Sequence, residues 1–437
     1  MLCMAWRGRS GCWMAGGLAC TALLVCALAG AAESGPDAKH KADVGPAPTI
    51  RIEVTSLGFV PPSRFYLSAR MSSVTLDFID KDHLLFTFRK SGLVPRLPDE
   101  PKDDEDRIIC AVVLDAGTGK VVERAEWRMH DRQRYLWAIG DGKFLVRQRN
   151  ALYLTDSHLE LRPYMQFNTN LQSIEIAPDH NLMAVEFEKF DRPAADDDAQ
   201  TKPKPTLDDD LLGTQPRRKS TQILIVRPMD LTVVARSEAH HAVSVPLLNT
   251  GMIQVLEGKR PDLWEVQNRP FGGEPAILGE VKSACTPMVQ ALSKSAVMTV
   301  GCYGGTSDRA VTVMSAEGKL LWQDRWQPRY IWPTFEFAEN GTRFAYGSLQ
   351  LNHTIGTMDP FGDEDVQGQM VGVFDTETGK LQLVKNATPA LSAGHNYALT
   401  ADGSRFAILR DGALEVYDLP PAPPASAPVQ APNVAAK

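Results

Sequence analysis

Histidine and acidic side chains are the residues of this chain whose types could support metal or acid–base chemistry. His130, His240, His241, His353 and His395 lie between apolar segments. Three such side chains could hold zinc, but no H-E-x-x-H motif or other fixed ligand spacing occurs. Adjacent His240 and His241 would also point to opposite sides of an extended segment. The pattern therefore favours solvated or core-satisfied histidines, and a divalent metal stays open without assigned ligands.

Carboxylates gather in three long inserts, 91–107, 191–219 and 350–368. One interpretation is a negative rim that attracts a cationic partner or divalent ions. The other is a set of solvated, like-charged loops, which the prolines of 191–219 favour. No insert has the spacing of an EF-hand. The candidate binding face comprises acidic residues of the inserts and several histidines: Asp103, Asp104, Asp106, His130, His240, His353, Asp363, Glu364, Asp365 and His395.

Other catalytic signatures are missing, so no catalytic residue is assigned. The G-x-S-x-G hydrolase turn, the phosphate-binding Walker loop and the dinucleotide fingerprint do not occur. A formal net charge of −7 offers no basic surface for the backbone of a nucleic acid. Two function classes remain: a binding or scaffold protein, and an enzyme that assembles its site from scattered loops.

The elements that would position these residues are short β-strands in a repeat. A strand–turn–strand unit such as LDFIDKDHLLFTF (76–88) or YALTADGSRFAIL (397–409) occurs seven times, and a second hairpin such as CAVVLDAGTGKVVERAEW (110–127) follows each one. Seven four-stranded antiparallel blades of about 44 residues predict an all-β, seven-bladed β-propeller over 49–419. The last unit lacks its outer strand, which TIRIEVTS (49–56) could supply to close the ring.

The second hairpins carry a recurrent turn motif. D-x-x-T-G-K occurs at 115–120 and 375–380, and E-G-K-L-L-W occurs at 317–322. These repeats resemble the quinoprotein-like and WD-like β-propeller superfamily, although the chain has no Trp-Asp dipeptide. The resemblance implies a propeller but no activity, because its members range from enzymes to scaffolds. Quinone-dependent alcohol dehydrogenases of this superfamily usually place two adjacent cysteines beside the cofactor, and this chain has none, so no quinone is expected.

The first residues have the layout of a secretory signal peptide, predicted at 1–31. Arg7 and Arg9 precede the apolar run 18–29, and the small residues 29–31 follow it. The run of 12 residues is shorter than the roughly 20 needed to span a membrane, so no transmembrane anchor is expected after cleavage. A lipoprotein is less favoured because Val25, rather than a small residue, precedes Cys26.

The remaining terminal segments are expected to be disordered. Residues 32–48 form a predicted linker, and 420–437 form a tail rich in proline and alanine. The predicted location is the periplasm or the extracellular space, where disulfides persist.

A disulfide between Cys285 and Cys302 is predicted from hairpin register. If Ser293 and Lys294 form a two-residue turn, Cys285 lies directly opposite Cys302 as a non-hydrogen-bonded pair, with a Cα separation of about 4.5 Å. Cys110 would then remain a buried thiol.

These patterns predict an exported, non-enzymatic binding or scaffold propeller for a protein or small ligand. All three inserts connect the second and third strands of a blade, so we expect the partner on that insert-bearing face and little to grip a ligand on the opposite, tight-turn face. The alternative is a hydrolase similar in architecture to lactonases, with a metal or a His–carboxylate pair in the central funnel.

Overall fold

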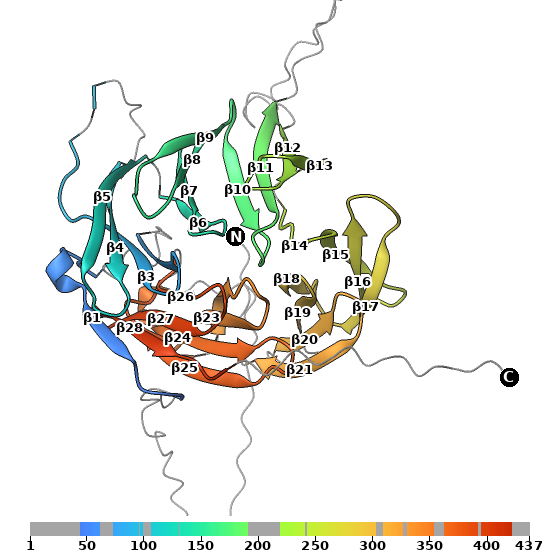
Figure 1. The fold of residues 1–437 in the computed structure, drawn as a ribbon. Helices are drawn as coiled ribbons and strands as arrows, with labels where there is room; N and C mark the ends of the chain where they lie inside the picture. The colour runs from blue at the N-terminus through green and yellow to red at the C-terminus, as the bar shows by residue number, and fades with distance from the viewer. Residues whose placement is uncertain are drawn as a thin grey trace, which may run out of the picture. The chain divides into compact units, whose positions relative to one another are not determined.

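The chain folds into a ring of β-sheets. The computed structural model describes residues 44–61, 73–95, 97–98, 106–130, 132–190, 219–240, 243–302, 309–326, 330–353, 362–391 and 395–421. These residues form seven four-stranded antiparallel sheets arranged in a ring, as Figure 1 shows. The predicted all-β, seven-bladed propeller is therefore confirmed. The predicted signal peptide lies outside the described residues, which include no helix long and apolar enough to cross a membrane.

Blades 1 to 3 follow the chain, with the first strand of each blade innermost. Blade 1 contains β2 (Val74–Phe78), β3 (His83–Arg89), β4 (Arg107–Asp115) and β5 (Val121–Met129). Blade 2 contains β6 (Leu136–Ala138), β7 (Phe144–Gln148), β8 (Ala151–Thr155) and β9 (Arg162–Gln166). Blade 3 contains β10 (Leu171–Ile176), β11 (Met183–Phe190), β12 (Lys219–Val226) and β13 (Val233–Ala239).

Blades 4 to 6 repeat this order. Blade 4 contains β14 (Leu247–Leu248), β15 (Gly251–Glu257), β16 (Leu263–Pro270) and β17 (Ala276–Lys282). Blade 5 contains β18 (Met288–Ser293), β19 (Ala296–Cys302), β20 (Arg309–Ser315) and β21 (Leu320–Trp326). Blade 6 contains β22 (Tyr330–Phe337), β23 (Arg343–Leu351), β24 (Val366–Asp375) and β25 (Leu381–Ala387). Short 3₁₀ turns, η1 (Thr55–Leu57) and η2 (Asp363–Asp365), lie outside the blades.

Blade 7 is completed by the N-terminal strand, as predicted. It contains β26 (Tyr397–Leu399), β27 (Arg405–Arg410), β28 (Ala413–Asp418) and β1 (Ile50–Glu53). Ile52 pairs with Leu414 and is only 6% exposed, so β1 contributes to the core as well as to the hydrogen-bond ladder. Val44 also pairs with Val384 of β25, so the segment that leads into β1 touches blade 6 before it joins blade 7.

The core lies between neighbouring blades. Leu76 and Val112 of blade 1, for example, belong to one buried cluster with Ala407 and Leu414 of blade 7. Alternate residues of a strand point to opposite faces of its sheet, so each blade buries both faces only when a neighbour lies on each side.

The repeated turn motif has a local structural role. The Asp115 carboxylate accepts hydrogen bonds from the backbone N–H of Thr118 at 2.7 Å and from its hydroxyl at 2.7 Å. Gly119 follows with φ +71°, a left-handed conformation that favours glycine. Asp375 and Thr378 repeat these contacts in blade 6. The motif therefore specifies the hairpin between the third and fourth strands.

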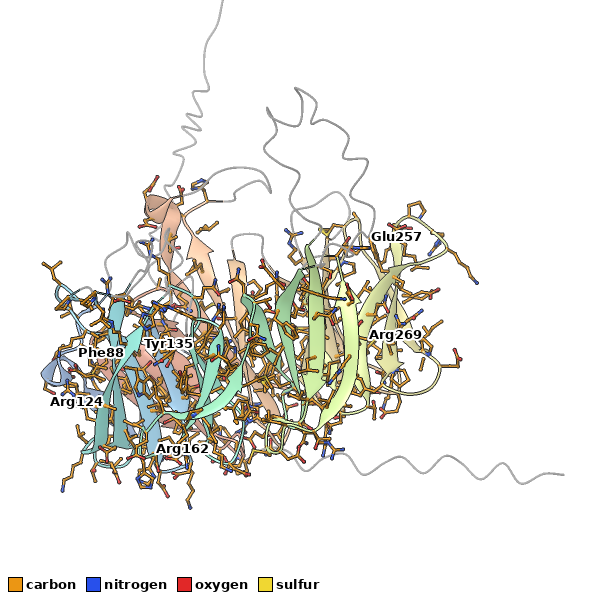
Figure 2. All side chains as sticks on the ribbon, turned by 90° about the horizontal axis from the view of Figure 1, so that it is seen from above. Phe88, Arg124, Tyr135, Arg162, Glu257 and Arg269 are labelled. Atoms are coloured by element: carbon orange, nitrogen blue, oxygen red, sulfur yellow. A yellow bond between two sulfur atoms is a disulfide. The ribbon has the colours of Figure 1, made fainter. Side chains whose placement is uncertain are left out.

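The two faces of the ring carry different connections. Links between the second and third strands, and between successive blades, emerge on the insert-bearing face, whereas the tight hairpin turns emerge on the other face. In the edge-on view of Figure 2, Glu257 at the end of β15 lies on the insert-bearing face, and Arg162 at the start of β9 lies on the tight-turn face.

The structure contains the predicted disulfide between Cys285 and Cys302, but in a different register. Ala291 pairs with Val297 and Ser293 with Ala296, so Leu292 is an extra residue at a bulge. Cys285 consequently lies before β18 in the link from blade 4, with its Cα 5.6 Å from that of Cys302. Our assumption of a direct cross-strand pair was therefore wrong, because the two turn residues are Lys294 and Ser295 rather than Ser293 and Lys294, and because Leu292 bulges.

Removing the buried side chain of β1 tests the closure. Ile52→Ala should lower the free energy of unfolding by about 2–4 kcal/mol, because it leaves a cavity between blades 7 and 1. Deletion of 49–56 should lower it further by exposing the edge of β28. Chemical denaturation followed by tryptophan fluorescence measures both effects.

Glu53→Ala is the matched control, because this side chain is exposed on the same strand. Its effect should stay within about 0.5 kcal/mol. An unchanged denaturation midpoint in the 49–56 deletion would contradict the role of β1 in closing the ring.

Counting thiols tests the disulfide. A chain that begins after residue 31 carries three cysteines, of which Cys285 and Cys302 are bridged and Cys110 is buried and free. One thiol should therefore react under denaturing, non-reducing conditions, and three after reduction. Three reactive thiols before reduction would show that the bridge is absent.

Candidate functional site

Two adjoining cavities lie where the innermost strands meet at the centre of the ring. The cavity at the tight-turn face has a volume of about 660 Å³ and draws its lining from blades 1, 2, 3, 6 and 7. A second cavity of about 550 Å³ lies further along the inner strands. Both are lined by Asp77, His180 and Glu336, so the two cavities adjoin, and together they are called the channel below.

The location of the larger cavity corrects one expectation. We expected little to grip a ligand on the tight-turn face, because short turns offer few side chains. The ring instead brings the short turns of several blades together, and residues such as Asp141, His158 and Asp402 line one shared hollow. Because several turns meet around the axis, together they supply enough side chains to line a cavity, which a single turn could not do.

Asp77 and Arg134 form the charged centre of the channel with Glu336. Burial raises the pKa of Asp77 to about 7, and the nearby Glu336 carboxylate adds to the rise, while Arg134 opposes it. Arg134 is exposed and lines the inner cavity, and burial among the surrounding residues lowers its pKa against the opposing charges of Glu336 and Asp77. Its guanidinium lies 5.3 Å from the centre of the Trp137 ring. Asp77 can therefore exchange a proton near neutral pH.

A histidine–carboxylate pair lies beside this centre. Nδ1 of His395 hydrogen-bonds to Oε1 of Glu336. The His395 ring is parallel to that of Tyr397, whose hydroxyl lies 2.7 Å from the Thr334 hydroxyl. With Nδ1 engaged and the ring held in place, Nε2 is the nitrogen left to meet a ligand or a water.

A second such pair lies at the tight-turn face, where Nδ1 of His180 is 2.9 Å from Oε1 of Glu339.

The wall formed by blade 3 contributes two further carboxylates. Glu175 accepts a hydrogen bond from the Val245 N–H at 2.7 Å and lies near the Ser244 hydroxyl. Glu186 of β11 is 1% exposed. Burial raises the pKa of both side chains.

Among the described members of the predicted binding face, His395 lines the channel, and the others are not in its lining. Asp106 contacts Arg128 and lies 2.8 Å from Nδ1 of His130 in blade 1. In blade 6, His353 lies 3.8 Å from the Asp365 carboxylate.

The remaining members of the predicted face give no further cluster. Asp363 and Glu364 join Asp365 in η2, and His240 is exposed. Asp103 and Asp104 lie outside the described residues. No group of three or more His, Cys, Asp or Glu side chains suited to a metal ion occurs in the described part of the chain.

Three of the channel carboxylates, none of them predicted, have a common signal in the sequence. Asp77 stands in Leu-Asp-Phe, Glu175 in Ile-Glu-Ile and Glu336 in Phe-Glu-Phe, each at the same position of the first strand of its blade. An acid between two apolar residues of an inner strand, repeated in three blades, indicates a polar axis.

Comparisons with known proteins show no established family. No family model and no curated protein matches the chain. Among solved structures, it is similar to an acylaminoacyl peptidase of Pyrococcus horikoshii, with a TM-score of 0.45, 11% identity, and coverage of 83% of this chain and 53% of that one. It thus spans about half the length of that peptidase.

Two further structures give similar likenesses. The Myceliophteria thermophila Cps50 (Swd1) β-propeller domain has a TM-score of 0.37 and 11% identity over 80% of this chain and 97% of that one. TolB of Acinetobacter baumannii has a TM-score of 0.34 and 9% identity over 76% and 77% of the two chains. These likenesses carry no argument about activity, and membership of the quinoprotein-like superfamily stays a prediction.

Asp77→Asn tests the charged centre. The native pKa of about 7 exceeds the roughly 3.9 of an unfolded aspartate, so this proton stabilises the folded state fully below about pH 4, and the stability is lost as the pH rises to about 7. Wild type should therefore lose stability relative to Asp77→Asn across that interval. Urea denaturation at several pH values measures the difference.

Asp402→Asn is the control, because Asp402 also lines the channel. Burial raises the pKa of Asp402, but hydrogen bonds from Ser404 and the Thr400 hydroxyl outweigh it, so the net pKa is lowered. Its stabilising effect is lost only as the pH falls through that lowered pKa, so the gap from wild type should stay constant between about pH 5 and 8. The same flat profile for Asp77→Asn would contradict the raised pKa.

Proposed function

We propose that this chain is an exported, non-enzymatic binding propeller that holds a small molecule or the end of a peptide in its central channel. The observation that carries the proposal is the channel of two adjoining cavities, lined by polar groups that converge from several blades. Pockets of this size that combine apolar walls with a few placed charges are typical ligand sites. The described lining includes nine carboxylates and three cationic side chains: Asp77, Asp80, Asp141, Asp156, Glu175, Glu186, Glu336, Glu339, Asp402, Lys81, Arg134 and Lys143.

Export is supported by the disulfide between Cys285 and Cys302, because such bonds persist in oxidising compartments. In this proposal the location is the periplasm or the extracellular space. The insert-bearing face is proposed to contact a protein partner, while the channel takes the ligand. Asp106, just before β4, and His130, just after β5, lie on that face.

A hydrolase is the second candidate, favoured by the His395–Glu336 pair. Nε2 of His395 would take a proton from a water whose oxygen bonds to the carbonyl carbon of an ester or lactone. When the C–O bond then breaks, protonated Asp77 would give its proton to the leaving oxygen. Glu336 would hold the imidazole in the required tautomer.

Channel variants test the binding proposal. A thermal-shift screen of purified chain against amino acids, short peptides, polyamines and sugars should yield stabilising compounds. Arg134→Ala and Glu336→Gln should raise the ligand concentration that gives a half-maximal shift at least tenfold, because both side chains line the channel. His353→Ala, whose side chain is 59% exposed on the insert-bearing face, should leave them unchanged. Shifts that depend on His353 and not on Glu336 would contradict the proposal.

Esterase assays separate the two candidates. A non-enzymatic binder should hydrolyse phenyl acetate and dihydrocoumarin no faster than buffer does. Hydrolysis that falls at least a hundredfold in His395→Gln, but not in His180→Gln, would replace the binding proposal with the hydrolase.

A further inference from the structure

Glu186 is a buried acid with no hydrogen-bond partner among the described residues. It lies on β11 opposite Ser173 of β10, and it lines the inner cavity although only 1% of its surface is exposed. Neither carboxylate oxygen has a hydrogen-bond partner within the described chain. The Ser173 hydroxyl and the Val243 N–H lie close enough to favour its charged form without completing a hydrogen bond, and they do not offset the burial that raises its pKa. Buried carboxylates are seldom left in this condition unless something else satisfies them.

Glu175 lies in the same wall, and its charge interacts with that of Glu186. Burial raises the pKa of Glu175, and the charge of Glu186 adds to the rise. Within the described lining of the inner cavity, Arg134 is the only cationic side chain, and its charge interacts with Asp77 and Glu336. The pair at Glu175 and Glu186 thus lacks a counter-charge from the described chain.

We propose that Glu175 and Glu186 form a subsite for the ammonium group of an organic cation, with Ser173 and Ser244 beside them. This inference rests on the proposed function, because it assigns the class of ligand that the channel takes. An ammonium has three N–H donors, and acceptors on both acids and a neighbouring hydroxyl would satisfy them. The apolar side chains of Ile176, Val243 and Phe337 line the same cavity and suit an alkyl chain.

A divalent metal fits this wall less well. Calcium takes six to eight oxygen ligands and magnesium demands a near-octahedral set. The described residues offer no group of three or more metal-ligating side chains. A cation that forms directional hydrogen bonds and carries its own apolar body matches two carboxylates in a partly apolar cavity better.

Spermidine and cadaverine are the probes, titrated calorimetrically into the mature full chain at low ionic strength. Glu186→Gln should raise the dissociation constant for spermidine at least tenfold, and Glu175→Gln should do the same. Glu188→Gln is the matched control, because it removes the same charge from the same strand at a position that does not line the cavity. It should leave the dissociation constant within about twofold.

A second measurement needs no variant. Cadaverine should bind the wild type, whereas 1,5-pentanediol, of equal chain length without charge, should not. Failure of cadaverine to bind, or equal affinity of spermidine for wild type and Glu186→Gln, would overturn the ammonium subsite. Calcium or magnesium that binds at this wall in place of both amines would overturn it in favour of a metal.

The ammonium subsite and ligand binding in the channel can fail separately in these experiments. If neutral compounds bind in the channel and depend on Arg134 and Glu336 but not on Glu186, the ammonium subsite is wrong and channel binding stands. If no compound of any class binds in a way that depends on the channel residues, both are wrong.

Discussion

A blade has two apolar faces, and only another blade can cover each of them. This constraint fixes the arrangement of the whole chain. Leu76 and Val112 are buried because Ala407 and Leu414 reach them from the far end of the sequence, and the same exchange recurs between the other neighbouring blades. Pairing of β1 with β28 completes the last blade. The four residues of β1 therefore help to close the ring in which all the other blades pack.

The same geometry creates the channel. Inner strands that converge on an axis place their polar side chains at short range, whatever their separation along the chain. Asp77 and Glu336 come from blades 1 and 6, yet the charge of Glu336 raises the pKa of Asp77, and both carboxylates act on Arg134. A ligand there would meet groups already held in position by the packing behind them, such as His395 against Tyr397.

The repeated blades were predictable from the sequence, and the central channel was not. Strand, turn and repeat signals are local, so the blade count, the outer strand of blade 7 and the Asp115 turn follow from residue order. Neither the position of the turn at Lys294 and Ser295 nor the bulge at Leu292 has such a signal, which is why the disulfide was predicted correctly and its register was not. The channel depends on residues of different blades meeting, and only the repeated acid at Asp77, Glu175 and Glu336 hints at it.

The pairing of Ile50 with Val416 also sets an order of events during biogenesis. The two halves of blade 7 lie at opposite ends of the propeller sequence, so a chain emerging from a ribosome or a translocation pore holds β1 unpaired until its last strand is out. Until then blades can stack in an open arc, but blade 7 lacks its middle and inner strands, and the axis has no complete wall. Loop closure over such a length is slow. Newly made chains therefore pass through a stage in which the edge of β1 has no partner strand.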